Sequence, residues 1–226
     1  MSLRHFYEEP SEGVTEATCS EESVINTVTR MLSDYAAHYD NLLDVGCGAN
    51  LTYDLSAVER GVKLVGVDFA YNFLRLAPRN DRISLVQADV EQLPFADQSF
   101  DAAVCSEVAE HVPDDNAVVS EIARVLRPNG LLFLTVPNLG SAHYLINRLK
   151  RRDIALNFHD NGHLREYTKA TATRLVTPHF AVERYYSVHF GWSGLLGSPI
   201  DASIAFAPVR RFSKSIAMVA RKKPEN

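Results

Sequence analysis

The chain has 226 residues, of which 46% are hydrophobic and 23% are charged, values that are typical of a soluble globular protein. Its formal net charge of −5 argues against a dedicated nucleic-acid binder, because such proteins usually carry a basic surface. No apolar run is long enough to span a membrane, and residues 1–9 lack the apolar centre of a signal peptide. The three cysteines have no metal-ligand spacing, and their odd number favours a reducing compartment, so we expect a cytoplasmic protein.

Taken in chain order, the sequence predicts one helix followed by alternating strands and helices. Apolar side chains at helical spacing predict the first helix from residue 20 to residue 38. Short apolar runs predict strands at residues 42–45, 63–68, 82–89, 100–106, 131–136, 182–188 and 213–220. Further helices are expected at residues 52–60, 72–77, 116–126, 142–149 and 168–176.

This alternation predicts right-handed βαβ units that build one sheet, because parallel neighbouring strands need a crossover connection. We therefore expect an α/β fold, a three-layer α/β/α sandwich with a seven-stranded, mostly parallel sheet. The pattern predicts a single domain over residues 1–226. Its parts are an N-terminal arm and helix (residues 1–40), a central core (41–137), and a substrate-side insertion with the final strands (138–226).

A turn that contains glycines follows the first expected strand, with the sequence Asp44-Val-Gly46-Cys-Gly48. Glycines let a backbone approach a ligand closely, and the turn lies where parallel sheets bind ligands. The dinucleotide fingerprint requires a third glycine at a position that Leu51 occupies here. The turn also lacks the Gly-Lys-Ser/Thr ending of a triphosphate-binding loop, so neither nucleotide class is favoured. A turn with a purely structural role is the alternative interpretation.

Several motifs of the central core follow one another in a characteristic order. They are Asp44–Asn50, Val67-Asp68, Gln87–Asp89, Leu93–Asp101, Ser106–Val112 and Glu121–Gly130. In these motifs the chain resembles class I S-adenosylmethionine-dependent methyltransferases, and among them the type 11 group that includes quinone-biosynthesis enzymes. The resemblance covers residues 40–138, and Asn50 stands where the family commonly has a glycine. It implies S-adenosylmethionine as the cofactor and a Rossmann-like sheet whose last strand is antiparallel, with the central core as the cofactor-binding part.

The resemblance also implies which residues bind the cofactor. They are Asp44, Gly46, Cys47, Gly48, Asp68, Phe69, Asp89, Val90 and Ser106. Asp44 is expected at the methionine end, Asp68 at the ribose hydroxyls and Asp89 at the adenine amino group. As alternatives, Asp68 and Asp89 are helix caps, and Cys47 is a buried packing residue.

Methyl transfer from a sulfonium is an in-line displacement that rests largely on the alignment of donor and acceptor. A base is needed only where the acceptor must lose a proton. Glu107, His111 and His163 are the candidate catalytic residues for that step. We expect a small-molecule acceptor, with oxygen as the favoured acceptor atom and carbon or nitrogen left open. Neither a nucleic-acid substrate nor a membrane-spanning segment is expected.

Two further alternatives stay open at this point. Glu107, Glu110 and His111 resemble a string that holds a divalent ion in some related methyltransferases, but a structural hydrogen-bonding role is favoured and no metal is expected. The other alternative is a module that keeps the cofactor loop for regulation or assembly and has no catalytic activity. The intact Asp44 and Asp68 argue against such a module, and Leu51 argues against a nicotinamide-dependent oxidoreductase.

Overall fold

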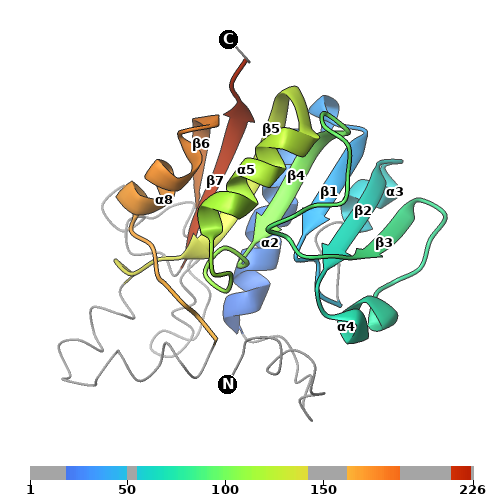
Figure 1. Ribbon diagram of the computed structural model, residues 1–226, viewed down its shortest axis with the longest axis horizontal. Helices are drawn as coiled ribbons and strands as arrows, with labels where there is room; N and C mark the ends of the chain where they lie inside the picture. Colours follow the sequence, from blue (N-terminus) through green and yellow to red (C-terminus); the bar gives the residue numbers. More distant parts are fainter. Residues whose placement is uncertain (1–18, 50–54, 142–161, 189–214, 225–226) are drawn as a thin grey trace, which may run out of the picture.

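The computed structural model describes residues 19–49, 55–141, 162–188 and 215–224, which form one seven-stranded sheet with helices on both faces (Figure 1). The strand order is β3-β2-β1-β4-β5-β7-β6. The strands are β1 (Asn41–Val45), β2 (Lys63–Asp68), β3 (Ile83–Gln87), β4 (Phe100–Ser106), β5 (Leu126–Pro137), β6 (Phe180–Ser187) and β7 (Ser215–Lys222). Each of the seven strands expected from the sequence is present.

The pairing of the strands confirms the expected fold class. β1 has parallel neighbours on both sides, β2 and β4, and the pairs β2–β3 and β4–β5 are parallel as well. β7 is antiparallel to both of its neighbours, β5 and β6. The sheet is therefore mostly parallel with an antiparallel last strand, as the resemblance implies.

The start of β5 differs from the expected one. Leu126 already pairs with Phe100 of β4, and the next pair joins Leu131 to Ala102, so the residues between them bulge out of the ladder. Asn129 in this bulge has a φ of +63°. The sequence pattern marks only the continuous apolar run from Leu131, which explains why the expected strand starts too late.

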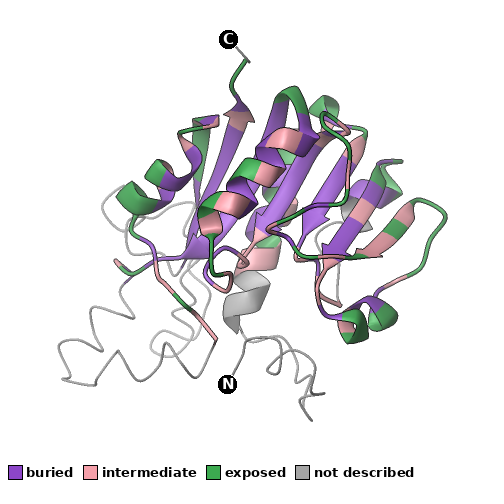
Figure 2. Ribbon diagram, viewed as in Figure 1, coloured by how far each residue is buried: buried purple, intermediate pink, exposed green. Residues whose placement is uncertain are grey.

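Two layers of helices enclose the sheet. α2 (Cys19–Asp34), α3 (Leu55–Glu59) and α4 (Tyr71–Leu76) contribute to one core cluster, whereas α5 (Asp115–Val125) and α8 (Lys169–Val176) contribute to the other. The short 3-10 helix η1 (Ala36–His38) follows α2. Figure 2 shows mostly buried strands between the two layers. In β1, Leu42 faces one cluster and Leu43 the other, as alternate residues do in a strand that is covered on both faces.

The helices α5 and α8 have well-defined starts beside the carboxyl edge of the sheet. The Asp114 side chain accepts hydrogen bonds from the amides of Asn116 and Ala117 and caps α5. Thr168 caps α8 in a capping box with Thr171. Each cap contributes about 1 kcal/mol and fixes the segment that precedes its helix.

Among the described residues, no helix combines the length and the apolar character that a membrane crossing requires. The helix expected at residues 142–149 lies outside the described residues.

Candidate active site

A cavity of about 440 Å³ opens at the carboxyl ends of β1, β2, β3 and β4. Open parallel sheets bind ligands at this edge, because the loops that leave the strands there surround a shared crevice. The cavity is lined by Gly46, Gly48, Asp68, Phe69, Ala70, Phe73, Asp89, Val90, Glu91, Glu107, Val108, His111, Val112 and Pro113. Its volume lies in the usual range for small-molecule and cofactor pockets.

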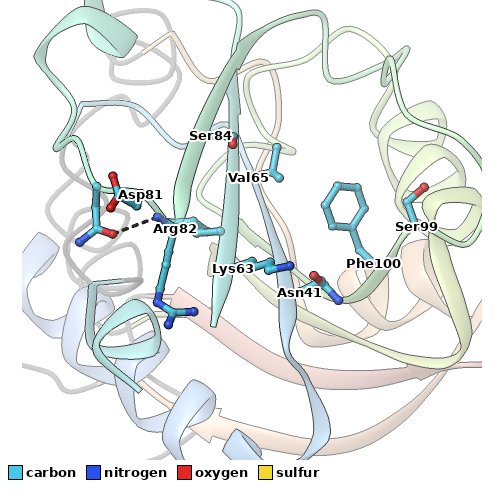
Figure 3. A pocket seen from close by; sticks show the side chains of 10 residues that line it. Asn41, Lys63, Val65, Asp81, Arg82, Ser84, Ser99 and Phe100 are labelled. Carbon is cyan, nitrogen blue, oxygen red and sulfur yellow. Dashed lines mark hydrogen bonds between the residues drawn. The ribbon is translucent and has the colours of Figure 1, made fainter. Parts of the chain in front are cut away.

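A second hollow, of about 540 Å³, opens at the opposite ends of the same strands (Figure 3). Lys63 begins β2 and Phe100 begins β4, so both lie at the amino edge of the sheet. At this rim Arg82 serves local structure, because it donates its amide to Asn80 and its guanidinium to the carbonyl of Gly61. We therefore place the candidate active site in the cavity at the carboxyl edge.

The turn after β1 is held in shape by the neighbouring strand. Gly46 and Cys47 both donate their amides to the carbonyl oxygen of Val67, at 2.8 and 2.9 Å. Gly46 and Gly48 have φ angles of +73° and +57°, in the left-handed region that favours glycine. A Cβ at Gly46 would lie 2.4 Å from Cγ2 of Val108, so the turn and the cavity wall are in close contact.

The hydrogen bonds of this turn decide which ligands it suits. A pyrophosphate site needs several backbone amides that point at the ligand. The amides of Gly46 and Cys47 instead bond to Val67, and the amide of Gly48 donates to Oδ2 of Asp68 at 2.8 Å. Over the described residues Gly46–Gly48, the turn presents a close-packed backbone surface rather than a cluster of donors, which disfavours a dinucleotide.

Asp68, the last residue of β2, lines the cavity with a carboxylate whose two oxygens are each held by a hydrogen bond. Its Oδ2 accepts from Gly48 and its Oδ1 accepts from the amide of Ala70, both at 2.8 Å. Each carboxylate oxygen has a second acceptor site, so Asp68 can also accept two hydroxyl groups of a ligand. The pKa of Asp68 is raised, because burial disfavours the charged form more than the two amide hydrogen bonds stabilise it.

A largely apolar wall continues from Asp68. Phe69 and Phe73 both line the cavity. The side-chain amide of Gln87 donates to the backbone carbonyl of Phe69 at 3.0 Å and fixes the position of that residue. Asp89 follows β3 and accepts the amide of Glu91 at 2.9 Å, which holds its carboxylate at the rim. Aromatic faces beside a pair of carboxylates suit a flat base that is attached to a sugar.

The end of β4 brings a strained residue to the cavity. Glu107 has a φ of +56°, and such a backbone costs a non-glycine residue about 1–2 kcal/mol. Its amide donates to the carbonyl of Thr135 at 3.0 Å, which holds it in this conformation. Strain of this kind is concentrated at functional sites. The preceding residue, Ser106, hydrogen-bonds to the Thr135 hydroxyl at 2.9 Å.

Residues 162–168, here called the strap, form hydrogen bonds to residues 109–113, in the wall of the cavity that follows β4. Leu164 donates its amide to the carbonyl of Glu110 at 2.7 Å, and Nδ1 of His111 lies 3.2 Å from the carbonyl of Gly162. The Arg165 guanidinium donates to three more carbonyls of this wall, at 2.7–3.0 Å, those of Ala109, Val112 and Pro113. The strap therefore fixes the backbone that carries the lining residues Val108, His111, Val112 and Pro113.

Buried ionisable groups gather between the strap and the wall. His163 packs edge to face on His111 with ring centroids 4.8 Å apart, and its Nδ1 lies 3.0 Å from Oε1 of Glu166. Burial, and next the nearby His163, lower the pKa of His111 to about 4, so its ring is neutral near pH 7. Glu110 is fully buried, and burial followed by the charge of Glu107 raises its pKa well above the usual range.

The structure brings most of the expected site residues together. Eight of them line the cavity: Gly46, Gly48, Asp68, Phe69, Asp89, Val90, Glu107 and His111. Four others do not line it. Asp44 is fully buried in β1, Cys47 packs its Sγ against Gly66, Ser106 bonds to Thr135, and His163 lies behind His111.

The sequence reasoning missed several residues of the site. Phe73, Glu91 and Pro113 line the cavity but stand outside the motifs, and Val108 and Val112 lie inside one without having been singled out. Their position directly after the expected strands is the signal that would have identified them. Glu110 was already named in the string with Glu107 and His111, whereas Glu166 had no such signal.

Comparison with known proteins agrees with this geometry. Residues 43–134 match the family described as "Methyltransferase domain". This part of the chain resembles a methyltransferase domain. A curated relative named "Ubiquinone biosynthesis O-methyltransferase", from Idiomarina loihiensis, is 38% identical over 111 residues, which are 46% of this chain and 45% of the relative. The chain thus spans about half the length of the curated relatives that it matches.

Solved structures share the fold over most of the chain. A Pyrococcus horikoshii protein has a TM-score of 0.67 at 21% identity and covers 97% of this chain and 99% of its own. An S-adenosylmethionine-dependent methyltransferase of Methanosarcina mazei has a TM-score of 0.62 at 20% identity, with 86% and 98% covered. At this identity the likeness shows the Rossmann-like methyltransferase fold.

S-adenosylmethionine, the cofactor of this family, fits the residues of the cavity. The closely packed Gly46 leaves no room for a side chain between the turn and Val108, whereas no described residue lies within 4 Å of a Cβ built on Gly48. Asp68 has two acceptor sites for ribose hydroxyls, and Phe69 has an aromatic face for adenine.

The strap gives a first testable prediction. We expect Arg165→Ala to lower the free energy of unfolding by about 1–2 kcal/mol, because three carbonyls lose a charged donor that is partly exposed to water. Urea denaturation measures this change. The matched control is Arg75→Ala on the exposed side of α4, for which we expect a change within about 0.5 kcal/mol. Equal losses in the two variants would contradict a role for the strap.

Proposed function

We propose that this protein transfers a methyl group from S-adenosylmethionine to a small-molecule acceptor, with oxygen as the favoured acceptor atom. The observation that carries the proposal is Asp68, whose carboxylate bridges the amides of Gly48 and Ala70 at the cavity and has the geometry for two ribose hydroxyls. The relatives named as O-methyltransferases support oxygen as the acceptor atom.

In this proposal each lining residue has a defined part. The turn at Gly46 and Gly48 holds the methionine end, Asp68 the ribose, and Phe69 with Val90 the adenine ring. Asp89 accepts from the adenine amino group at the rim. The buried Asp44 and Cys47 and the partly buried Ser106 support the turn and the end of β4 from beneath, and thereby act on the cofactor through the backbone.

The acceptor lies, in this proposal, beside Glu107 and His111, the two ionisable residues that line the cavity after β4. The bound cofactor supplies an electrophilic methyl group on a positively charged sulfur. The acceptor oxygen forms the new bond to carbon while the carbon–sulfur bond breaks and leaves its electron pair on sulfur. Glu107 accepts the proton that a hydroxyl acceptor loses, and His163 orients His111 from behind.

The whole chain acts as one domain in this proposal, in a reducing cytoplasmic compartment and without a nucleic-acid partner. Cys47 and Cys105 are buried and form no disulfide within the described part of the chain, as such a compartment allows. The formal net charge of −5 supports a small acceptor over a nucleic acid.

A thermal-shift experiment tests the cofactor. S-adenosylhomocysteine at 100 times its dissociation constant stabilises the folded state by about 2.7 kcal/mol. We expect a rise in melting temperature of about 5–10 °C for a chain of this size. NAD is the control and should leave the melting temperature unchanged. Stabilisation by NAD alone would overturn the proposal in favour of an oxidoreductase.

Catalysis is tested separately from binding. Incubation with S-adenosylmethionine and a panel of hydroxylated small molecules should release S-adenosylhomocysteine, measured by mass spectrometry. A protein that binds the cofactor but releases none with any acceptor would be a regulatory or assembly module.

A further inference from the structure

We propose that Glu91 positions the adenine end of the cofactor by joining the two walls of the cavity. Oε1 of Glu91 accepts the backbone amide of Asp114 at 2.6 Å, and this hydrogen bond is here called the rim contact. Glu91 lines the cavity after β3, whereas Pro113, the residue before Asp114, lines it after β4. This role rests on the proposed function, because it concerns the same cofactor site.

The rim contact joins segments that leave strands far apart in the sheet. β2 and β1 lie between β3 and β4, so the ends of β3 and β4 are about 14 Å apart at the usual spacing of neighbouring strands. Figure 1 shows the segment after β3 running back across the sheet toward the start of α5. There it meets the segment after β4, and the rim contact ties the two walls together. The distance between the walls therefore depends on this hydrogen bond.

The wall after β3 is anchored to the side of α5. Glu121 of this helix accepts the amide of Leu93 at 2.8 Å, and it also forms an ion pair with Arg124. The Arg124 guanidinium donates to the carbonyls of Leu93 and Phe95, at 3.0 and 2.8 Å. These contacts fix the backbone two residues beyond Glu91, so the Glu91 side chain projects from a well-held segment.

The wall after β4 is anchored on both sides of the Asp114 amide. The Asp114 side chain caps α5, and the carbonyl of Pro113 accepts a hydrogen bond from the Arg165 guanidinium at 2.7 Å. The rim contact places the Glu91 carboxylate beside the first turn of α5, at the positive end of the helix dipole, which favours a negative charge. Because both ends of the rim contact are held by other hydrogen bonds, it fixes the two walls relative to each other.

Val90 connects the rim contact to the adenine site. In the proposed function Val90 and Phe69 hold the adenine ring, and Val90 directly precedes Glu91 in the cavity wall. Without the rim contact, the segment that carries Val90 gains positions in which the adenine pocket is too wide. The apparent affinity for the cofactor then falls in proportion to the fraction of molecules in such positions.

Two substitutions separate the hydrogen bond from the charge. Glu91→Asp keeps the charge, but its side chain is one methylene shorter and cannot reach the Asp114 amide from the same backbone position. Glu91→Gln loses the charge but keeps an oxygen acceptor at the same reach. Calorimetric titration with S-adenosylhomocysteine should show binding about 5–10-fold weaker for Glu91→Asp, and within about 3-fold of the unchanged protein for Glu91→Gln. The nucleoside 5′-methylthioadenosine, which has the adenine end without the amino-acid end, should show the same ratios.

Gln92→Ala is the matched control, because Gln92 is the exposed neighbour of Glu91 and does not line the cavity. It should bind both ligands as the unchanged protein does. A measurement without ligand tests the rim contact itself. Hydrogen exchange at the Asp114 amide, followed by NMR, should be about 5–10-fold faster in Glu91→Asp than in the unchanged protein. Melting temperatures without ligand should agree within about 2 °C for all variants, since these substitutions lie at the surface.

The role of Glu91 is overturned if Glu91→Asp binds S-adenosylhomocysteine as tightly as the unchanged protein, or if Glu91→Gln loses as much affinity as Glu91→Asp. It is also overturned if Glu91→Asp leaves the binding of methylthioadenosine unchanged, or if the Asp114 amide exchanges equally fast in the two proteins. Failure of the unchanged protein to bind either ligand would overturn the proposed function as well. Equal binding by the unchanged protein and by Glu91→Asp would leave the proposed methyl transfer standing and remove the role of Glu91 alone.

Discussion

Gly46→Ala is expected to lower the free energy of unfolding by about 2–4 kcal/mol, from a left-handed backbone and an overpacked contact together. Gly46 has a φ of +73°, and its added Cβ would lie 2.4 Å from Cγ2 of Val108. Either the turn or the wall after β4 must then shift. Since both line the cavity, we also expect S-adenosylhomocysteine to bind more weakly. Urea denaturation and calorimetric titration measure the two effects.

Gly48→Ala is the matched control, because Gly48 shares the left-handed conformation with a φ of +57° but has none of the described residues within 4 Å of the added Cβ. We expect a loss of about 1–2 kcal/mol from the backbone alone. The double variant Gly46→Ala/Val108→Ala removes the overlap and should recover part of the stability. If Gly46→Ala is no more destabilised than Gly48→Ala, the close contact between Gly46 and Val108 does not affect the free energy of unfolding.

Asp68→Ala should weaken the binding of S-adenosylhomocysteine by about 100-fold or more. Two hydrogen bonds to a charged group contribute about 1.5–3 kcal/mol each, and 1.4 kcal/mol is a factor of ten in affinity. Calorimetric titration gives the dissociation constant, and circular dichroism shows whether the variant is folded.

The same substitution also removes the acceptor of the Gly48 and Ala70 amides, so a structural effect must be separated from lost ribose contacts. Asp68→Asn keeps an oxygen acceptor and most of the side-chain volume, and it should bind with intermediate affinity. Asp89→Ala, at the exposed rim, should cost less than Asp68→Ala. Unchanged affinity in Asp68→Ala would contradict the ribose assignment, and so would equal effects at the two aspartates.

The central core was predictable because its signals are local. The strand before Gly46 and the strand that ends in Asp68 follow one another along the chain and pair in the sheet, so strand order alone brings their ends to one edge. The left-handed backbone of Glu107 had no such signal, since any sequence rule would expect glycine there.

The strap contacts were not predictable, because they join residues that are far apart in the chain. His111 and Gly162 are separated by 51 positions, and only the folded sheet brings them to 3.2 Å. The assignment of Ser106 to the cofactor rested on its place at a strand end. Its hydroxyl bonds to Thr135 of the neighbouring strand, a contact that depends on the register between β4 and β5.

The position of β7 between β5 and β6 has a consequence for the order of folding. Pro137 of β5 pairs with Ser215, and Leu131 pairs with Arg221, so β5 cannot gain its second neighbour before residues 215–222 have been synthesised. β6 likewise has β7 as its partner in the sheet. Contacts between such distant segments are slow to form, because the entropy of closing the long loop is lost before the pairing contributes any stabilisation. A nascent chain therefore exposes an open strand edge until this late pairing is complete, and this interval is when it is most prone to aggregate or to need a chaperone.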